Sequence, residues 1–191
     1  MTAQTSKWTW EHAPTDWHEK PGSLTQTVPA GTDYWRVTHY GFIRDNGPFR
    51  YQMHGGDFEA RVRISGQYRE LFHQAGLMIR IDERNWIKSG IEFVNGKQNL
   101  SAVVTRDCSD WSVIPLPDNP EFTWLKFQRH KEALKIEYSP DNANWSMLRL
   151  AYFPPNVPVK IGLMAAAPGN LDFSVTFDYF TVSPLTDMSD L

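Results

Sequence analysis

The chain has 191 residues, of which 41% are hydrophobic and 21% charged, and this balance is typical of a globular protein. A net charge of −3 gives no general attraction to nucleic acid, a single cysteine excludes a disulfide framework, and no apolar run approaches the roughly 20 residues of a membrane helix. We therefore expect no nucleic acid and no membrane among the partners. Residues 1–10 are polar and lack the apolar segment of a signal peptide, which predicts a cytoplasmic location.

Strand-like runs rich in aromatic and β-branched residues recur along the chain, and turns containing glycine, proline, asparagine or aspartate separate them. No run has a convincing helical period. Asn95-Gly96 is the best hairpin signal and joins the seventh and eighth runs. We predict strands, in chain order, at residues 7–12, 24–28, 34–38, 49–54, 58–65, 75–81, 86–94, 100–105, 111–116, 123–130, 134–139, 147–151, 159–166 and 173–182.

This spacing of short strands and turns predicts an all-β sandwich or barrel. No linker divides the chain, so we expect one domain at residues 1–183 and a flexible C-terminal tail at residues 184–191. A Gly-Leu-Met triplet at residues 76–78 and again at 162–164 hints at comparable positions in one sheet. Alternation along the strands predicts a core between two sheets that includes Leu77, Ile79, Ile91, Phe93, Val104, Phe127, Ile136, Ile161, Leu163 and Phe177.

The run at residues 86–94 carries the most informative alternation. Trp86, Lys88 and Glu92 lie on one face of this strand, opposite its apolar face. The preceding strand is joined to it by a short turn, so the two are expected to be neighbours, with Arg80 on the same polar face. Arg80 would then lie within ion-pair reach of Glu92 or beside Lys88. Two cations and one carboxylate would suit an anionic or hydroxyl-rich ligand.

Several motifs resemble those of a widespread family of domains of unknown function that includes the fungal regulation-of-enolase protein. They are Gln-Ala-Gly-Leu-Met-Ile-Arg at residues 74–80, Trp-Ile-Lys-Ser-Gly-Ile-Glu-Phe at 86–93, Ser-Asp-Trp-Ser at 109–112, Thr-Asp-Tyr-Trp-Arg at 32–36 and Gly-Leu-Met-Ala-Ala-Ala-Pro at 162–168. The resemblance extends over residues 8–183. It implies a concanavalin A-like fold, as in lectins and glucanases: a jelly-roll sandwich of two curved antiparallel sheets. It implies no settled biochemical activity.

Catalytic and metal-binding patterns are weak in this sequence. A retaining glucanase needs a nucleophile and an acid about 5–5.5 Å apart, and no run of paired carboxylates supplies them. Asp57 and Glu59 share a strand face, but Asp57 reads as a turn residue. The six histidines lack metal-ligand spacing. We therefore assign no catalytic residue, no metal and no cofactor.

Our first hypothesis is a non-catalytic binding module that recognises a saccharide or a sugar-phosphate-like ligand on the concave sheet. One alternative is a glycoside-acting enzyme that uses Glu92 with a second carboxylate from elsewhere in the chain. Another is a protein-interaction module that regulates a metabolic enzyme, which would require a large exposed apolar patch outside the groove. The expected ligand-binding residues are Trp35 and Tyr51 at the rim, with Met78, Arg80, Trp86, Lys88, Glu92 and Met164 in the floor.

Overall fold

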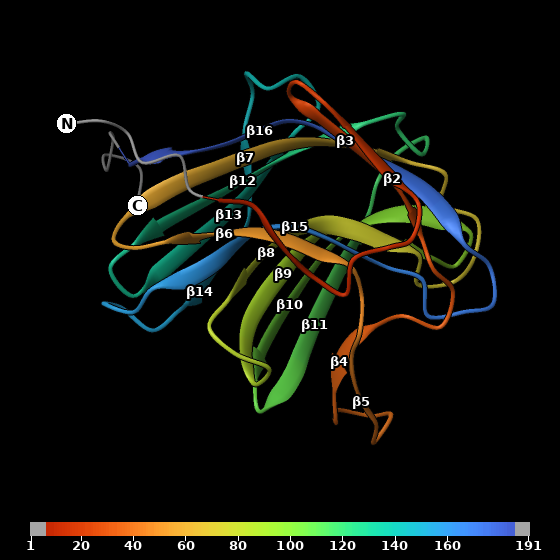
Figure 1. The fold of residues 1–191 in the computed structure, drawn as a ribbon, viewed down its shortest axis with the longest axis horizontal. Coiled ribbons are helices and arrows are strands. Elements are labelled where there is room, and N and C mark those ends of the chain that lie inside the picture. Colours follow the sequence, from red (N-terminus) through yellow and green to blue (C-terminus); the bar gives the residue numbers. More distant parts are fainter. Residues whose placement is uncertain (1–6, 186–191) are drawn as a thin grey trace.

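Two antiparallel sheets of seven strands each face one another in the computed structural model, which describes residues 7–185 (Figure 1). The strands are β1 Thr9–Glu11, β2 Trp17–Lys20, β3 Ser23–Val28, β4 Tyr34–Arg36, β5 Ile43–Asp45, β6 Phe49–His54, β7 Phe58–Gly66, β8 Gln74–Arg80, β9 Asn85–Val94, β10 Lys97–Arg106, β11 Cys108–Pro115, β12 Thr123–His130, β13 Ala133–Ser139, β14 Ser146–Tyr152, β15 Val159–Ala166 and β16 Phe173–Pro184. The first sheet has the order β1-β6-β15-β8-β9-β10-β11, and the second has the order β14-β13-β12-β7-β16-β3-β2. Strands β4 and β5 form a separate hairpin.

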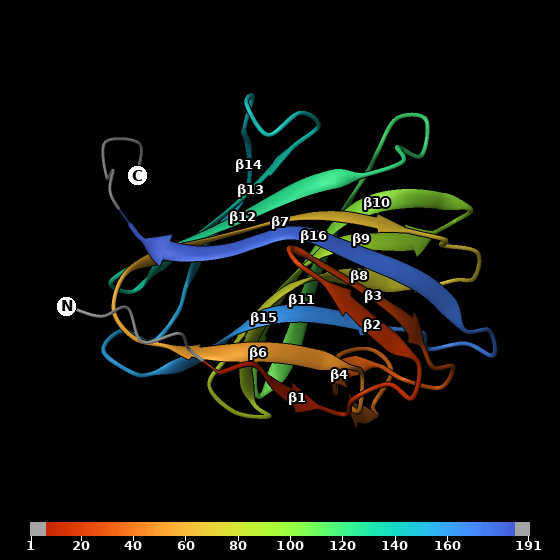
Figure 2. The same cartoon turned by 45° about the horizontal axis from the view of Figure 1, so that its top comes forward.

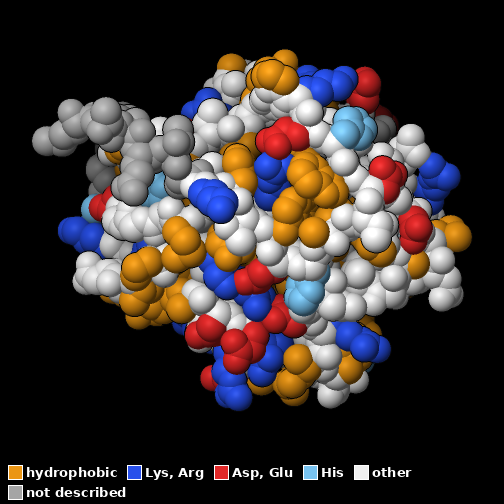
Figure 3. Space-filling model, viewed as in Figure 1, with side chains coloured by type: hydrophobic (Ala, Val, Ile, Leu, Met, Phe, Trp, Pro, Cys, Tyr) orange, Lys and Arg blue, Asp and Glu red, His pale blue; other side chains and the backbone are white. Residues whose placement is uncertain are grey.

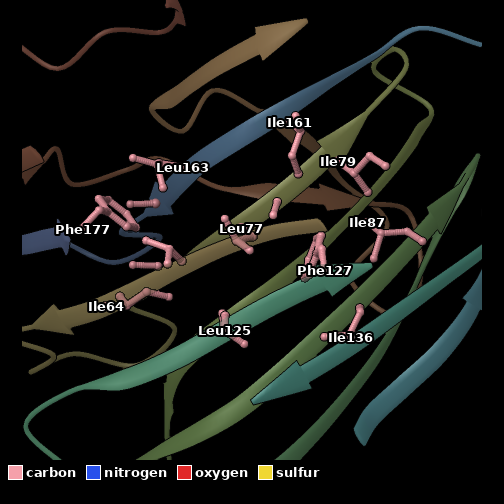
Figure 4. Packing of buried hydrophobic residues seen from close by; sticks show 14 of the residues in the cluster. Ile64, Leu77, Ile79, Ile87, Leu125, Phe127, Ile136, Ile161, Leu163 and Phe177 are labelled. Atoms are coloured by element: carbon pink, nitrogen blue, oxygen red, sulfur yellow. The ribbon is translucent and has the colours of Figure 1, made fainter. Parts of the chain in front are cut away.

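The predicted all-β sandwich is confirmed, and the core lies where the apolar faces of the two sheets meet (Figure 4). Nine of the ten predicted core side chains are buried. Phe93 is only half-buried, because it lies near the end of β9, next to the turn. Burial of a large aliphatic or aromatic side chain contributes roughly 1.5–3 kcal/mol, so this shared core is what holds the sheets together. No helix in the described part of the chain is long and apolar enough to cross a membrane.

Two local patterns in the sequence have direct structural counterparts. Asn95 and Gly96 both have positive φ, 53° and 74°, and they join β9 to β10 as the predicted hairpin. The two Gly-Leu-Met triplets lie on adjacent strands of the first sheet, β8 and β15. Gly76 is paired with Met164 and Gly162 with Met78, so each glycine faces a methionine across the ladder.

The sequence prediction missed two strands, β2 and β5. Every residue of β2 is exposed, and β5 has only three residues, so neither shows the alternation that reveals a half-buried strand. The boundary expected after residue 183 falls inside β16, where Pro184 still pairs with Phe58. Most of the predicted tail, residues 186–191, lies outside the described residues, as do residues 1–6.

Gly90→Ala should destabilise the protein, because Gly90 of β9 lies directly opposite Gly76 of β8 with no room for a side chain. A Cβ atom at residue 90 would meet the Ala75 oxygen at 2.0 Å and the Gly76 Cα at 2.6 Å. We expect a loss of about 1–3 kcal/mol or more in the free energy of unfolding, measured by chemical denaturation. Gly55→Ala is the matched control, since a Cβ there meets nothing within 4 Å. Equal stability of the two variants would contradict this account.

Candidate ligand-binding site

The β4–β5 hairpin covers the face of the first sheet that points away from the second sheet, which we call the covered face. Tyr34 and Trp35 of the hairpin pack onto this face and form a second buried apolar cluster there. The rings of Tyr34 and Trp86 meet edge to face with centroids 6.1 Å apart. The hairpin is also tied to β11, because the Arg36 backbone N–H donates to Ser109 Oγ at 2.9 Å. The members of this cluster are Tyr34, Trp35, Phe49, Met78, Trp86, Val103, Met164 and Ala166.

A pocket of about 230 Å³ opens at one end of the covered face, between the hairpin and the sheet. Aromatic rings form its wall in a connected series. Trp35 meets Tyr40 at 5.7 Å, Tyr40 meets Phe72 at 6.5 Å, and Phe72 meets Trp111 at 6.1 Å between centroids. The residues that line it are Asp33, Trp35, Tyr40, Phe42, Phe72, Gln74, Lys88, Glu92, Val103, Trp111 and Pro168.

Lys88 is the buried cation of the pocket floor. Its Nζ donates to the Tyr34 carbonyl oxygen at 2.8 Å and also to Gln74 Oε1. Burial lowers the pKa of the Lys88 ammonium below its usual value, while the charges of Asp33 and Glu92 act in the opposite direction. The lysine thus links the hairpin backbone to the polar side chain of Gln74 in the pocket floor.

Glu92 is the buried acid of the floor. Its Oε2 accepts a hydrogen bond from Trp111 Nε1 at 2.8 Å, and the same indole donates to Ser101 Oγ at 3.1 Å. Burial raises the pKa of the Glu92 carboxyl, and Lys88, Ser101 and Trp111 partly oppose this shift. A carboxylate held in this way can accept further hydrogen bonds from a ligand hydroxyl.

Asp33 supplies a second carboxylate to the pocket, and the sequence reasoning did not single it out. Its Oδ1 accepts from the Tyr34 backbone N–H at 2.7 Å and from Gln74 Nε2 at 3.4 Å. In formal charge, two carboxylates and one ammonium leave the pocket floor with one surplus negative charge. Within residues 7–185 no group of three His, Cys, Asp or Glu side chains is placed to hold a metal ion.

The predicted polar face exists, but it does not form one open groove. Strand register puts Arg80 opposite Trp86 and Met78 opposite Lys88, so these side chains do share a face with Glu92. Trp86 is 0% exposed, however, and the hairpin cluster fills the middle of the face. Of the eight residues expected at the site, the pocket contains Trp35, Lys88 and Glu92. The other five, Tyr51, Met78, Arg80, Trp86 and Met164, do not line it.

Arg80 corrects the expected charge balance. Instead of reaching Glu92 or Lys88, its guanidinium forms two hydrogen bonds to Asp45 at 2.5 and 2.7 Å and an ion pair with Glu11 at 3.4 Å. These acids come from β5 and β1, two segments distant in sequence from Arg80. The cation that we counted toward an anionic ligand is therefore already neutralised, and it lies outside the pocket.

Glu92→Gln should change how stability depends on pH. The pKa of Glu92 is raised in the folded protein, so its favourable contribution is present below the unfolded pKa and is lost as pH rises through the folded pKa. Glutamine does not titrate and can still accept the Trp111 hydrogen bond. The variant should therefore gain stability relative to the original protein over the range from about pH 4, the ordinary pKa of a glutamate, upward, measured by urea denaturation. Glu121→Gln, at an exposed carboxylate, is the control. A constant difference across that range would contradict the argument.

Comparisons with solved structures support the fold. A crystal structure of a functionally unknown protein from Saccharomyces cerevisiae aligns with a TM-score of 0.91 and 37% identity over 94% of this chain and 97% of that chain. The carbohydrate binding module CBM66 from Bacillus subtilis aligns with a TM-score of 0.61 and 14% identity over 93% of this chain and 96% of that chain, which is a likeness of fold alone. The expected concanavalin A-like jelly-roll sandwich is thereby confirmed.

Sequence comparison assigns the family. Regulation of enolase protein 1 from Saccharomyces cerevisiae is 38% identical over 178 residues, which are 93% of this chain and 90% of that protein. The family profile described as a protein of unknown function (DUF1349) matches residues 10–185. The motifs that carried the resemblance lie inside this match, and the chain belongs to the DUF1349 family.

Proposed function

We propose that the chain is a non-catalytic binding module that takes a neutral saccharide into the pocket beneath the β4–β5 hairpin. The observation that carries the proposal is the combination of an aromatic wall with a polar, buried floor. Aromatic rings pack against the apolar C–H faces of sugars, while a few fixed polar groups select the hydroxyls. Trp35 and Trp111 would provide the stacking surface, and Glu92 would accept hydroxyl hydrogen bonds.

The charge of the floor favours a neutral sugar over a phosphorylated one. Asp33 and Glu92 outnumber Lys88, and Arg80 is occupied by Asp45 and Glu11. A phosphate group would meet a surplus negative charge at short range, which disfavours binding. The shared fold with a bacterial carbohydrate-binding module supports a saccharide ligand by analogy only, because function belongs to sites and not to folds.

Isothermal titration with a panel of neutral mono- and disaccharides and their phosphorylated counterparts tests the proposal. Trp111→Ala and Glu92→Gln should each weaken binding of a neutral sugar by about tenfold or more, equivalent to about 1.4 kcal/mol. Trp145→Ala is the matched control, because this tryptophan does not line the pocket. Its ring centroid lies 4.3 Å from Lys126 Nζ. Binding that survives both pocket substitutions, or that is tighter for the phosphorylated sugars, would overturn the assignment.

The same samples distinguish binding from catalysis. Asp33 and Glu92 put two carboxylates into one pocket, and glycoside hydrolysis commonly uses such a pair. A binding module returns the saccharide unchanged after prolonged incubation. Release of a reducing sugar that is abolished by Glu92→Gln would instead make the chain a glycoside-acting enzyme.

A second candidate function is a protein-interaction module acting on a metabolic enzyme, and the tip of the hairpin favours it. Val37 and Ile43 are exposed, Ile43 by 53%, and neither lines the pocket. Val37 also holds a φ of 65°, which is costly for a β-branched residue and is the kind of strain found at functional segments. A yeast relative is named for the regulation of enolase, which makes enolase the partner to test.

Purified enolase should bind the chain in a biolayer or calorimetric assay if this second function holds. Val37→Asn together with Ile43→Thr would then reduce the affinity, because the apolar tip is removed while asparagine accepts the positive φ. Saccharide binding should be unaffected by this pair. Absence of binding by the original protein would exclude enolase as the partner.

A further inference from the structure

We propose a second binding site, for a small oxyanion, around Arg50 at the side of the sandwich formed by the N-terminal strands. The site lies where β1 and β6 of the first sheet approach β2 and β3 of the second sheet (Figure 2). A pocket of about 140 Å³ opens there beside Arg50, Glu19 and Leu24. This volume is several times larger than the space that one water molecule requires.

Arg50 points into the space between the sheets. It is paired with Trp10 on β1 and with Leu163 on β15, and Leu163 belongs to the core. Only 6% of Arg50 is exposed. The indole rings of three tryptophans surround its guanidinium carbon at 5.0, 5.6 and 5.1 Å, and they belong to Trp8, Trp10 and Trp17. The tryptophans hold the cation in place but use none of its N–H groups.

Most hydrogen-bond donors of this site lack a partner. Arg50 Nη2 donates to Glu19 Oε2 at 2.8 Å, whereas Arg50 Nε and Nη1 are buried and have no partner among the described residues. Trp10 Nε1, whose ring lies 5.6 Å from the Arg50 guanidinium carbon, is also buried without a hydrogen-bond partner in this part of the chain. Three buried donors without a hydrogen bond in the described chain thus lie on the guanidinium of Arg50 or on a ring that packs against it. Buried polar groups in native proteins are almost always hydrogen-bonded, so this concentration points to a ligand.

The chemistry of these atoms selects an oxyanion. Arginine and indole N–H groups only donate, and they need a ligand rich in acceptors. A fixed guanidinium adds a positive charge that strengthens hydrogen bonds to carboxylate or phosphate oxygens. Glu19, whose side chain is 46% exposed, shows that a carboxylate already fits against this cation. The unpaired guanidinium and indole N–H groups offer no lone pair to a metal ion, so they favour an anion.

This site is independent of the saccharide pocket. Arg50 faces the second sheet, whereas the pocket lies on the opposite, covered face of the first sheet. The two pockets have no lining residue in common. Substitutions in one site therefore leave the contacts of the other in place, and each proposal can fail without the other.

Side-chain ¹H–¹⁵N NMR tests the proposal with inorganic phosphate and acetate as separate probes, against sodium chloride at equal ionic strength. The resonances of Trp10 Nε1–H and Arg50 Nε–H should shift saturably with phosphate, acetate or both, and the arm that saturates identifies the anion class. The indoles of Trp35 and Trp111 are internal controls, since Thr38 and Glu92 already accept their hydrogen bonds. Shifts that rise linearly, or equally for all indoles, would overturn the site and leave ordinary solvation as the explanation.

Glu19→Gln provides a second measurement that does not depend on a disruptive core substitution. It removes the carboxylate that competes for Arg50, so anion affinity should rise by roughly threefold to tenfold. Glu121→Gln, at an exposed carboxylate, is the matched control and should leave the affinity unchanged. Arg50→Gln should abolish the saturable shift, provided that its NMR spectrum remains that of a folded protein. Unchanged affinity in Glu19→Gln would contradict the proposal.

Discussion

The buried ammonium of Lys88 is the constraint on which the covered face depends. A charge removed from water needs partners, and Lys88 finds the Tyr34 carbonyl, the Gln74 amide and the nearby acids Asp33 and Glu92. The hydrogen bond to the Tyr34 carbonyl holds the hairpin above the sheet. Gln74 and the two acids bring the polar groups of the pocket floor together around the ammonium. A single buried cation on β9 thus both positions the cover and organises the polar chemistry beneath it.

The fold was largely predictable from the sequence because its signals are local. Alternation is a property of neighbouring residues, and it placed Ile79, Ile91 and Leu163 correctly in the core. The site was predictable only in part. Lys88 and Glu92 followed from alternation on one strand, and Gln74 could have been found in the same way, since it shares a face with Met78. Trp35 of the aromatic wall was also expected, but Tyr40 and Phe42 were not, because they reach the pocket only through the tertiary position of the hairpin.

Arg80 likewise shows that local sequence patterns do not reveal ion-pair partners from distant segments. Its face was predicted correctly, but its partners Asp45 and Glu11 approach from segments that no local pattern connects to β8. A charge count made along two strands therefore included a cation that lies outside the pocket. On the face that Figure 3 shows, charged and apolar side chains are interspersed, and neither kind covers the whole face.

The contacts that define sites in this molecule form between distant segments, and one strand can contribute residues to two sites. Phe49 belongs to the covered face, while the next residue, Arg50, faces the opposite site.

The short strand β2 has a further consequence for the molecule in solution. Among residues 7–185 it is the last strand of the second sheet and has no strand on its outer side, and such edges are templates for pairing with another chain. Its four residues are all exposed, and they include Glu19 and Lys20. A short, charged edge offers little length to a second copy that would extend the sheet, and pairing would remove part of the hydration of its charged side chains. The features that hid β2 from sequence analysis therefore protect the sandwich from edge-to-edge aggregation.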